Sequence, residues 1–163
     1  MVLTDDTKKQ IDHWVAKYPA DKKRSAVVAA LLIAQKQNDG WLSNDIMNDV
    51  ADYLELKKIE VYEVATFYDM FELKPVGKHK ISICTNVSCM LRGADELVAC
   101  AKKRLNVELG GVTSDGQFML KETQCLAACA NAPMCQIDDE QYHLDLTPEK
   151  LIALIDELDQ GVA

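Results

Sequence analysis

Apolar side chains in the first 75 residues recur every three or four positions, which is the period of an amphipathic helix. The pattern predicts four helices: one that ends at Pro19, one over residues 22–37, one that begins after the capping residue Ser43, and one over residues 59–69. Ser43 suits a helix start because its hydroxyl can accept a hydrogen bond from a free backbone N–H of the first turn. These residues therefore indicate a helical bundle.

The period changes from helical to alternating after residues 74–77. Residues 79–84 alternate as a half-buried strand does, with Ile81 and Ile83 on one face. The remaining elements are expected to be a helix over residues 93–105, a hairpin with a two-residue type I′ turn at Asp115-Gly116, a second hairpin turning at residues 138–140, and a final helix with Thr147 as N-cap and Pro148 in its first position. This order predicts a small mixed sheet with helices packed on it.

The fold class is therefore expected to be α/β. A thioredoxin-like domain over residues 76–163 would follow an N-terminal helical domain over residues 1–75, which forms an arm.

Charge excludes one class of partner. The 163 residues include 26 acidic and 18 basic side chains, a net charge of −8, and phosphate binding requires concentrated Lys and Arg. We therefore expect no nucleic-acid partner.

The longest apolar stretch, residues 26–34, is far shorter than the ~20 residues that cross a bilayer. The first ten residues, MVLTDDTKKQ, contain no apolar core of signal-peptide length. These features predict a cytoplasmic protein. In a reducing compartment, cysteines are better candidates for metal ligands or reactive thiols than for disulfides.

Four of the six cysteines form two close pairs. Cys84 and Cys89 are separated by four residues, and Cys125 and Cys129 by three. Both pairs fall in loops expected to follow strands, so their side chains can converge. The other two, Cys100 in a helix and Cys135 in a strand, are expected to be small buried hydrophobic residues.

Three chemistries compete for the paired cysteines. A thioredoxin-type redox site requires two residues between its cysteines, and neither pair has that spacing. Structural zinc permits three or four intervening residues. A [2Fe–2S] cluster fits better, because C-x4-C opens the plant-type ligand pattern and four thiolates can hold two irons. A Rieske centre would need two histidines beside the cysteines, and all three lie elsewhere in the sequence: His13, His79 and His143. Spacing alone favours iron–sulfur and leaves zinc open.

The complete cysteine pattern, C-x4-C followed after 35 residues by C-x3-C, resembles that of the thioredoxin-like [2Fe–2S] ferredoxin family. Flanking segments are also similar to family segments: NDGWLS (38–43), VATFYDMF (64–71), KPVGKHKISIC (74–84), CMLRGADEL (89–97) and TQCLAACANAPM (123–134). The resemblance covers nearly the whole chain. It implies one [2Fe–2S] cluster ligated by Cys84, Cys89, Cys125 and Cys129.

The resemblance further implies an electron-transfer subunit of NADH:quinone oxidoreductase (complex I). Its cluster would exchange electrons with the FMN of a partner subunit that binds NADH. The chain would then lie in the peripheral arm of a membrane-bound complex and meet the membrane only indirectly. The glycines of the chain form no G-x-G-x-x-G motif, so we expect no NADH binding by this chain alone and no catalytic residue of its own.

Alternative hypotheses are the small subunit of an NAD-linked hydrogenase or formate dehydrogenase, and a free-standing ferredoxin or zinc-stabilised binding module. If the chain holds an iron–sulfur cluster in any of these proteins, the reduction potential of that cluster should be low. An oxidised cluster with four thiolates carries a net charge of about −2, and an acidic host compensates it poorly.

The N-terminal arm is expected to dock on the flavin-bearing partner. Large side chains gather around its predicted helix ends and in the connection that follows: Trp41, Phe67, Tyr68, Met70 and Phe71. Aromatic and Met side chains are enriched in interface cores, so we expect these residues at the surface of the arm.

Overall fold

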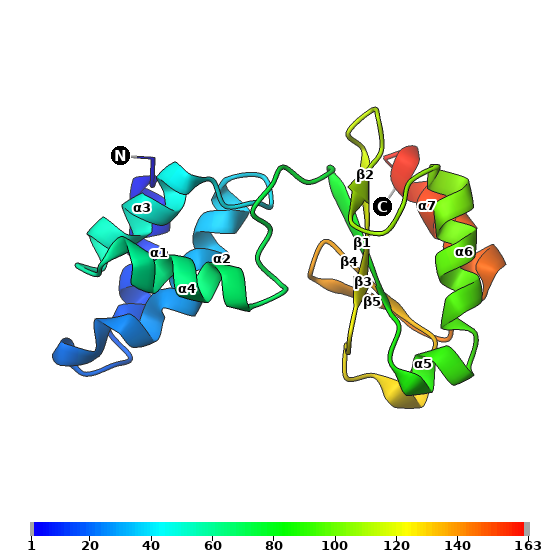
Figure 1. The fold of residues 1–163 in the computed structure, drawn as a ribbon, viewed down its shortest axis with the longest axis horizontal. Coiled ribbons are helices and arrows are strands. Elements are labelled where there is room, and N and C mark those ends of the chain that lie inside the picture. The colour runs from blue at the N-terminus through cyan, green and yellow to red at the C-terminus, as the bar shows by residue number, and fades with distance from the viewer. Residues whose placement is uncertain (1, 162–163) are drawn as a thin grey trace. The chain divides into compact units, whose positions relative to one another are not determined.

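The computed structural model describes residues 2–161 and divides into two compact units, one ending at Pro75 and the other beginning at Val76 (Figure 1). Each unit has its own hydrophobic core. The two units are described separately.

The N-terminal unit is entirely helical. Its elements are α1 (Asp5–Val15), the 3₁₀ helix η1 (Ala20–Ala26), α2 (Val27–Gln37), α3 (Asn44–Tyr53) and α4 (Lys58–Phe67). Thr4 and Ser43 cap α1 and α3, since their side chains accept hydrogen bonds from the N–H groups of Thr7 and Ile46. The prediction of a helix after Ser43 is therefore confirmed.

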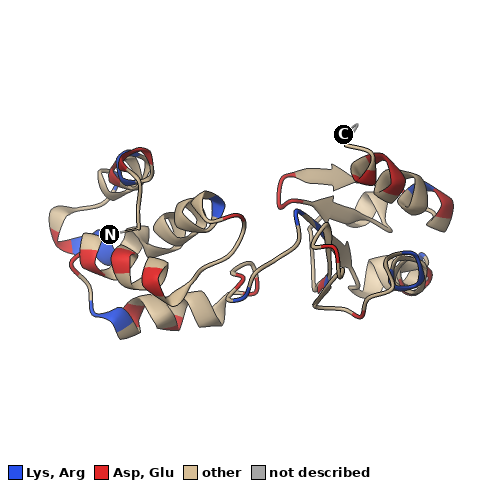
Figure 2. Ribbon diagram, turned by 90° about the horizontal axis from the view of Figure 1, so that it is seen from above, with Lys and Arg blue, Asp and Glu red and all other residues tan. Residues whose placement is uncertain are grey.

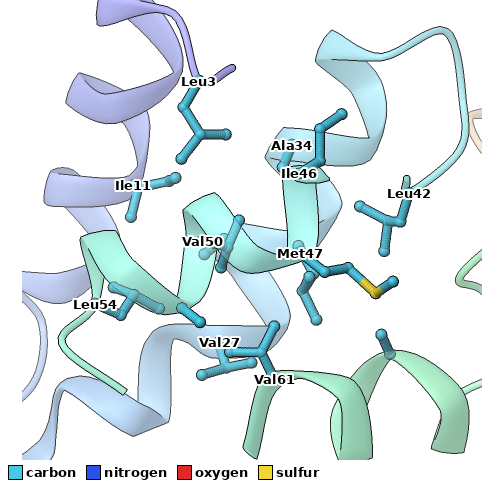
Figure 3. Packing of buried hydrophobic residues seen from close by; sticks show 14 of the residues in the cluster. Leu3, Ile11, Val27, Ala34, Leu42, Ile46, Met47, Val50, Leu54 and Val61 are labelled. Atoms are coloured by element: carbon cyan, nitrogen blue, oxygen red, sulfur yellow. The ribbon is translucent and has the colours of Figure 1, made fainter. Parts of the chain in front are cut away.

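Helix α2 lies at the centre of this unit and packs against α1, α3 and α4. Its buried side chains include Val27, Leu31 and Ala34. They meet apolar side chains of the surrounding helices, among them Ile11 and Val50 (Figure 3). A helix with apolar residues on most sides is stable only when neighbours cover it, which explains why the short helices form one bundle.

The predicted helix over residues 22–37 is wrong in its first turn. Residues 20–26 form a 3₁₀ helix with a non-helical residue at Lys22, and α2 begins only at Val27. This segment has no apolar face before Ala26 that could pack as an α-helix. Its basic side chains instead extend to acidic residues elsewhere, with Arg24 paired to Glu60 and Glu63.

The end of the helical unit is fixed by a buried amide. Gln35 on α2 donates a hydrogen bond to the Met70 carbonyl at 3.1 Å and accepts one from the Glu72 N–H at 2.8 Å. The Leu42 N–H also donates to the Glu72 carbonyl at 2.7 Å. The chain is therefore attached to the bundle up to residue 72.

The large side chains near this end are not all exposed, contrary to the sequence expectation. Phe67 and Tyr68 are 79% and 42% exposed. Phe71 is only 5% exposed and belongs to the bundle core, while Trp41 and Met70 are half-buried. The bonds of Gln35 to residues on either side of Phe71 draw this segment against α2, which accounts for the burial.

The C-terminal unit is a five-stranded mixed sheet with helices on it. Its strands are β1 (His79–Cys84), β2 (Gly111–Val112), β3 (Phe118–Thr123), β4 (Cys135–Ile137) and β5 (Gln141–His143), in the order β2-β3-β1-β4-β5. Only the central pair, β1 and β3, is parallel; the other pairs are antiparallel. Its helices are α5 (Val87–Leu91), α6 (Ala94–Leu105), the 3₁₀ helix η2 (Cys129–Asn131) and α7 (Pro148–Asp159). The prediction of a mixed α/β fold is confirmed.

Helices α6 and α7 lie side by side on one face of this sheet (Figure 1). Ile81 and Ile83 face them and share a core with Leu97 of α6 and Leu151 and Ile155 of α7. Alternating side chains of β1 therefore reach the helix layer, as the alternation predicted. Thr147 caps α7 and Pro148 occupies its first turn, which confirms that predicted start.

Two local predictions are corrected in this unit. At the first hairpin, Gly116 has a positive φ of 72° but Asp115 does not, so the turn is not type I′. The carboxylate of Asp115 accepts hydrogen bonds from the Thr113 hydroxyl and the Gln117 N–H, which holds a longer loop in place of a two-residue turn. Secondly, helix α5 precedes α6 and was not predicted.

Gly77 is required where the chain enters the sheet. A Cβ at this position would lie 2.5 Å from the carbonyl carbon of Phe118 and 2.8 Å from the nitrogen of Met119. Both are backbone atoms that cannot move aside, so the chain can run this close to β3 only with glycine.

Acidic and basic segments are interspersed along the helices of both units (Figure 2). None of the helices within residues 2–161 is long and apolar enough to cross a membrane.

Neighbouring leucines on α2 provide a test of the bundle core. Leu31 is fully buried, whereas Leu32 is 41% exposed. Leu31→Ala should lower the free energy of unfolding by about 2–5 kcal/mol because it removes buried methyl groups and leaves a cavity. Urea unfolding followed by the fluorescence of Trp14 and Trp41, which both lie in this unit, measures the loss.

Leu32→Ala is the matched control and should change the free energy of unfolding by no more than about 0.5 kcal/mol. Equal losses for the two variants would contradict the packing described for α2.

Candidate metal centre

Parallel pairing brings the two cysteine loops to one edge of the sheet. Cys84 is the last residue of β1 and is paired with Thr123, the last residue of β3. Because the carboxyl ends of parallel strands lie at the same edge, the loops that follow both strands start side by side. Cys84 and Cys89 belong to one loop region, and Cys125 and Cys129 to the other.

The first cysteine pair is buried. Cys84 and Cys89 are 3% and 2% exposed. Cys89 lies on α5, whose N-cap Asn86 accepts a hydrogen bond from the Val87 N–H at 2.7 Å. The two cysteines pack in a small apolar cluster with Ala94, Leu126, Ala132 and Met134. Leu126 belongs to the second loop, so this cluster joins the two loops.

The second cysteine pair is exposed to solvent. Cys125 follows β3, and Cys129 begins η2. Between them, Ala127 adopts a left-handed conformation with φ of 58°. Its N–H donates to the Cys125 sulfur at 3.3 Å. A non-glycine residue in this region carries strain, and such strain is concentrated at functional sites.

Polar bonds also connect the two loops. The Asn86 side chain donates to the Gln124 carbonyl at 2.6 Å, and Arg92 Nη1 donates to the Ala130 carbonyl at 3.2 Å. Backbone bonds add to these: the Thr85 N–H donates to the Thr123 carbonyl, and the Cys84 N–H to the Met134 carbonyl. The four cysteines are therefore carried by loops bonded to each other at several points.

Cys89 interacts electrostatically with Cys84 of its own pair and with Cys129 of the other pair. Burial raises the pKa of the Cys89 thiol to about 11, and a hydrogen bond with Cys84 and the charges of Cys84 and Cys129 act in the same direction. A hydrogen bond with the Met134 backbone partly opposes this rise. The influence of Cys129 on Cys89 shows that residues of the two pairs are close enough to interact.

The two cysteine pairs can supply the four ligands of a two-iron cluster. Structural zinc needs four ligands around one centre. A [2Fe–2S] cluster instead takes two thiolates at each of two irons, and this chain supplies two pairs of free thiols on adjoining loops.

The other candidate ligands lie elsewhere. Cys135 is fully buried on β4 in the main core of the sheet, and burial raises its pKa to about 12. Cys100 on α6 is only half-buried, which corrects the expectation of full burial. His79 begins β1 at the end opposite Cys84, with its Nδ1 2.9 Å from an Asp138 carboxylate oxygen. His143, on β5, is paired with Cys135.

Asn86, Arg92 and helix α5 were missed by the sequence analysis. Asn86 could have been recognised, since Asn directly before a short apolar run is a common N-cap. No pattern in the sequence identifies Arg92, because its acceptor is a backbone carbonyl in a loop 38 residues away.

Comparison with protein families agrees with this geometry. The model of a family described as "Thioredoxin-like [2Fe-2S] ferredoxin" matches residues 11–159. The chain belongs to this family. The family has a thioredoxin-like fold and one [2Fe–2S] cluster as its cofactor. Both agree with the prediction from the sequence.

Relatives of this ferredoxin-family chain include respiratory subunits. The chain is 49% identical over 144 residues to a subunit of the NADH-quinone oxidoreductase of Rickettsia bellii (strain RML369-C), covering 88% of this chain and 86% of the relative. It is 39% identical over 156 residues to the mitochondrial NADH dehydrogenase [ubiquinone] flavoprotein 2 of Dictyostelium discoideum, covering 96% of this chain and 63% of that protein.

A solved structure shares the fold. A chain of an NAD⁺-reducing [NiFe]-hydrogenase, in its air-oxidised state, superposes with a TM-score of 0.73 at 19% identity. The match covers 90% of this chain but only 25% of that one.

Single substitutions can test the ligand set. Replacing Cys84, Cys89, Cys125 or Cys129 by Ser should remove or strongly alter the visible iron–sulfur absorption, because oxygen is a poor substitute for a soft thiolate. Absorption spectra and iron content of each purified variant provide the measurement.

Cys100→Ala and Cys135→Ala are the matched controls, and both should retain the cluster spectrum. If Cys135→Ala lost its absorption while Cys84→Ser kept a normal spectrum, the ligand assignment would be wrong.

Proposed function

We propose that this chain is the electron-transfer subunit of an NADH:quinone oxidoreductase, with one low-potential [2Fe–2S] cluster held by Cys84, Cys89, Cys125 and Cys129. The observation that carries the proposal is the pairing of β1 with β3, which brings two free-thiol pairs to one edge of the sheet. The relatives at 39–49% identity support this assembly, since their names place them in NADH-quinone oxidoreductase and NADH dehydrogenase.

The cluster would accept and release single electrons, and its partner would be the FMN of the NADH-binding subunit. The protein supplies the site. The buried pair is kept away from bulk water by Leu126 and Met134, while the backbone N–H of Ala127 donates toward Cys125. Hydrogen bonds to sulfur and solvent exposure are the means by which a protein tunes an iron–sulfur potential.

The helical unit is proposed to dock on that flavin-bearing subunit. It carries none of the four proposed ligands, yet it ends in an exposed aromatic pair: the rings of Phe67 and Tyr68 stack edge-to-face with centroids 5.0 Å apart. The ring of Tyr68 also packs edge-to-face on the buried ring of Phe71, with the two centroids 6.4 Å apart. This contact anchors the aromatic pair to the bundle core. Rigid, exposed aromatic side chains are typical of binding hot spots.

The proposed location follows from the assembly. The chain would lie in the cytoplasmic peripheral arm of the complex and reach the membrane only through its partners. The small subunit of an NAD-linked hydrogenase is the alternative assembly, and the hydrogenase likeness supports it at the level of the fold alone.

The division of labour between subunits gives a kinetic prediction. The purified chain should not oxidise NADH by itself, because it lacks a dinucleotide-binding motif. When it is co-purified with its flavin- and NADH-binding partner, electrons from NADH added under anaerobic conditions should reach the cluster. Electron paramagnetic resonance of the frozen mixture detects the reduced cluster. Steady NADH turnover by the single chain, free of flavoprotein, would contradict this assignment.

The docking proposal can be tested at the exposed aromatic pair. Phe67→Ala should reduce co-purification with the flavin-bearing subunit about tenfold or more, since truncating a hot-spot side chain costs about 2 kcal/mol. The variant should keep its helical circular dichroism and its cluster spectrum. Leu32→Ala, another exposed apolar residue of the same unit, serves as control. If both variants co-purified with the partner as well as the wild type does, the proposal that this aromatic pair docks on the partner would be wrong.

A further inference from the structure

The two cysteine loops contain one charged residue besides the cysteines themselves. Within residues 84–93 and 123–134, Arg92 is the only charged side chain. The nearest charged residues along the sequence beyond these segments are mostly carboxylates, namely Glu122, Asp95 and Glu96. In a chain with a net charge of −8, a lone cation inside the metal-binding loops needs a reason.

Arg92 is bonded to both loops. Its backbone N–H, at the end of α5, donates to the Cys89 carbonyl at 3.1 Å. Its Nη1 donates to the carbonyl of Ala130, the residue after Cys129, at 3.2 Å. One residue therefore connects a proposed ligand of the first pair to the neighbour of a proposed ligand of the second.

The Asn86 bridge shows that a cation is not needed to join these loops. Its neutral amide reaches the Gln124 carbonyl, beside Cys125, at the shorter distance of 2.6 Å. The two bridges use the same kind of acceptor and differ in charge. The positive charge of Arg92 is therefore a separate property with its own consequence.

We infer that Arg92 is a positioning residue that raises the reduction potential of the [2Fe–2S] cluster, by fixing a positive charge beside the two loops that hold it. The inference rests on the ligand set proposed above. Reduction adds one electron, supplied in the complex by the partner's reduced flavin, and makes the cluster more negative. A nearby cation stabilises the reduced form more than the oxidised form. Arg suits this role because its guanidinium stays protonated and can hold a fixed hydrogen-bond geometry.

Removing the positive charge of Arg92 should therefore lower the reduction potential of the cluster. For a solvent-exposed side chain such as Arg92, we expect one unit charge to alter the one-electron reduction equilibrium of the cluster by about three- to tenfold. That range corresponds to a shift of about 30–60 mV for a one-electron couple.

The test is an anaerobic redox titration of the full-length, cluster-loaded chain, monitored by electron paramagnetic resonance. Arg92→Gln should shift the midpoint to a more negative value, and Arg92→Lys, which keeps the charge, should restore most of the shift. Arg104→Gln is the matched control. Arg104 lies in the same unit but near the far end of α6, about 15 Å along the helix from Ala94, and is paired with Asp156. It should leave the midpoint unchanged.

Each outcome distinguishes the inference from the function on which it rests. A wild-type chain without a [2Fe–2S] signal would overturn the ligand proposal and this inference with it. A normal wild-type cluster with the same midpoint in Arg92→Gln would overturn only this inference, and so would an equal shift in Arg104→Gln. If Arg92→Gln held too little cluster to titrate, retention in Arg92→Lys would support the role of charge, while loss in both variants would overturn it.

Discussion

The parallel pairing of β1 with β3 is the constraint on which the candidate site depends. Cys84 and Thr123 stand opposite each other at the ends of these strands, so both cysteine loops leave the sheet at the same edge. An antiparallel pair would send the two loops to opposite edges. The chain connects the parallel strands through α5 and α6, and α6 packs back on both of them. This connection through the helix layer places the starts of the two cysteine loops side by side.

The two cysteine pairs are held in position by different interactions. Cys84 and Cys89 are buried in an apolar cluster and hydrogen bonded to each other, so packing fixes their positions. Cys125 and Cys129 lie in solvent, where bonds from the other loop hold their neighbours Gln124 and Ala130. Packing thus orders one half of the site and hydrogen bonds the other. Positions supported by surrounding contacts are what a preorganised metal site requires.

Much of this structure could be predicted from the sequence because its signals are local. The Thr147-Pro148 helix start and the alternation around Ile81 each lie within a few residues, and the structure contains the helix and the strand that they predicted. The errors arose where a distant partner decides the conformation. The hydrogen bond between Gln35 and the backbone of Glu72, 37 residues later, places Phe71 in the core. Arg24 is paired with acidic residues of α4. The bridge from Arg92 to Ala130 likewise exists only after the sheet has formed.

Glu72 is hydrogen bonded to the helical unit and Gly77 lies close to β3, so residues 73–76 connect the two units. This connection spans about 14 Å at full extension. Once the helical unit has bound a common partner, the iron–sulfur unit stays tethered to it, at an effective concentration on the order of millimolar. Its own contact with the partner can therefore be weak and still stay occupied. A brief separation would be followed by rebinding before either unit could diffuse away.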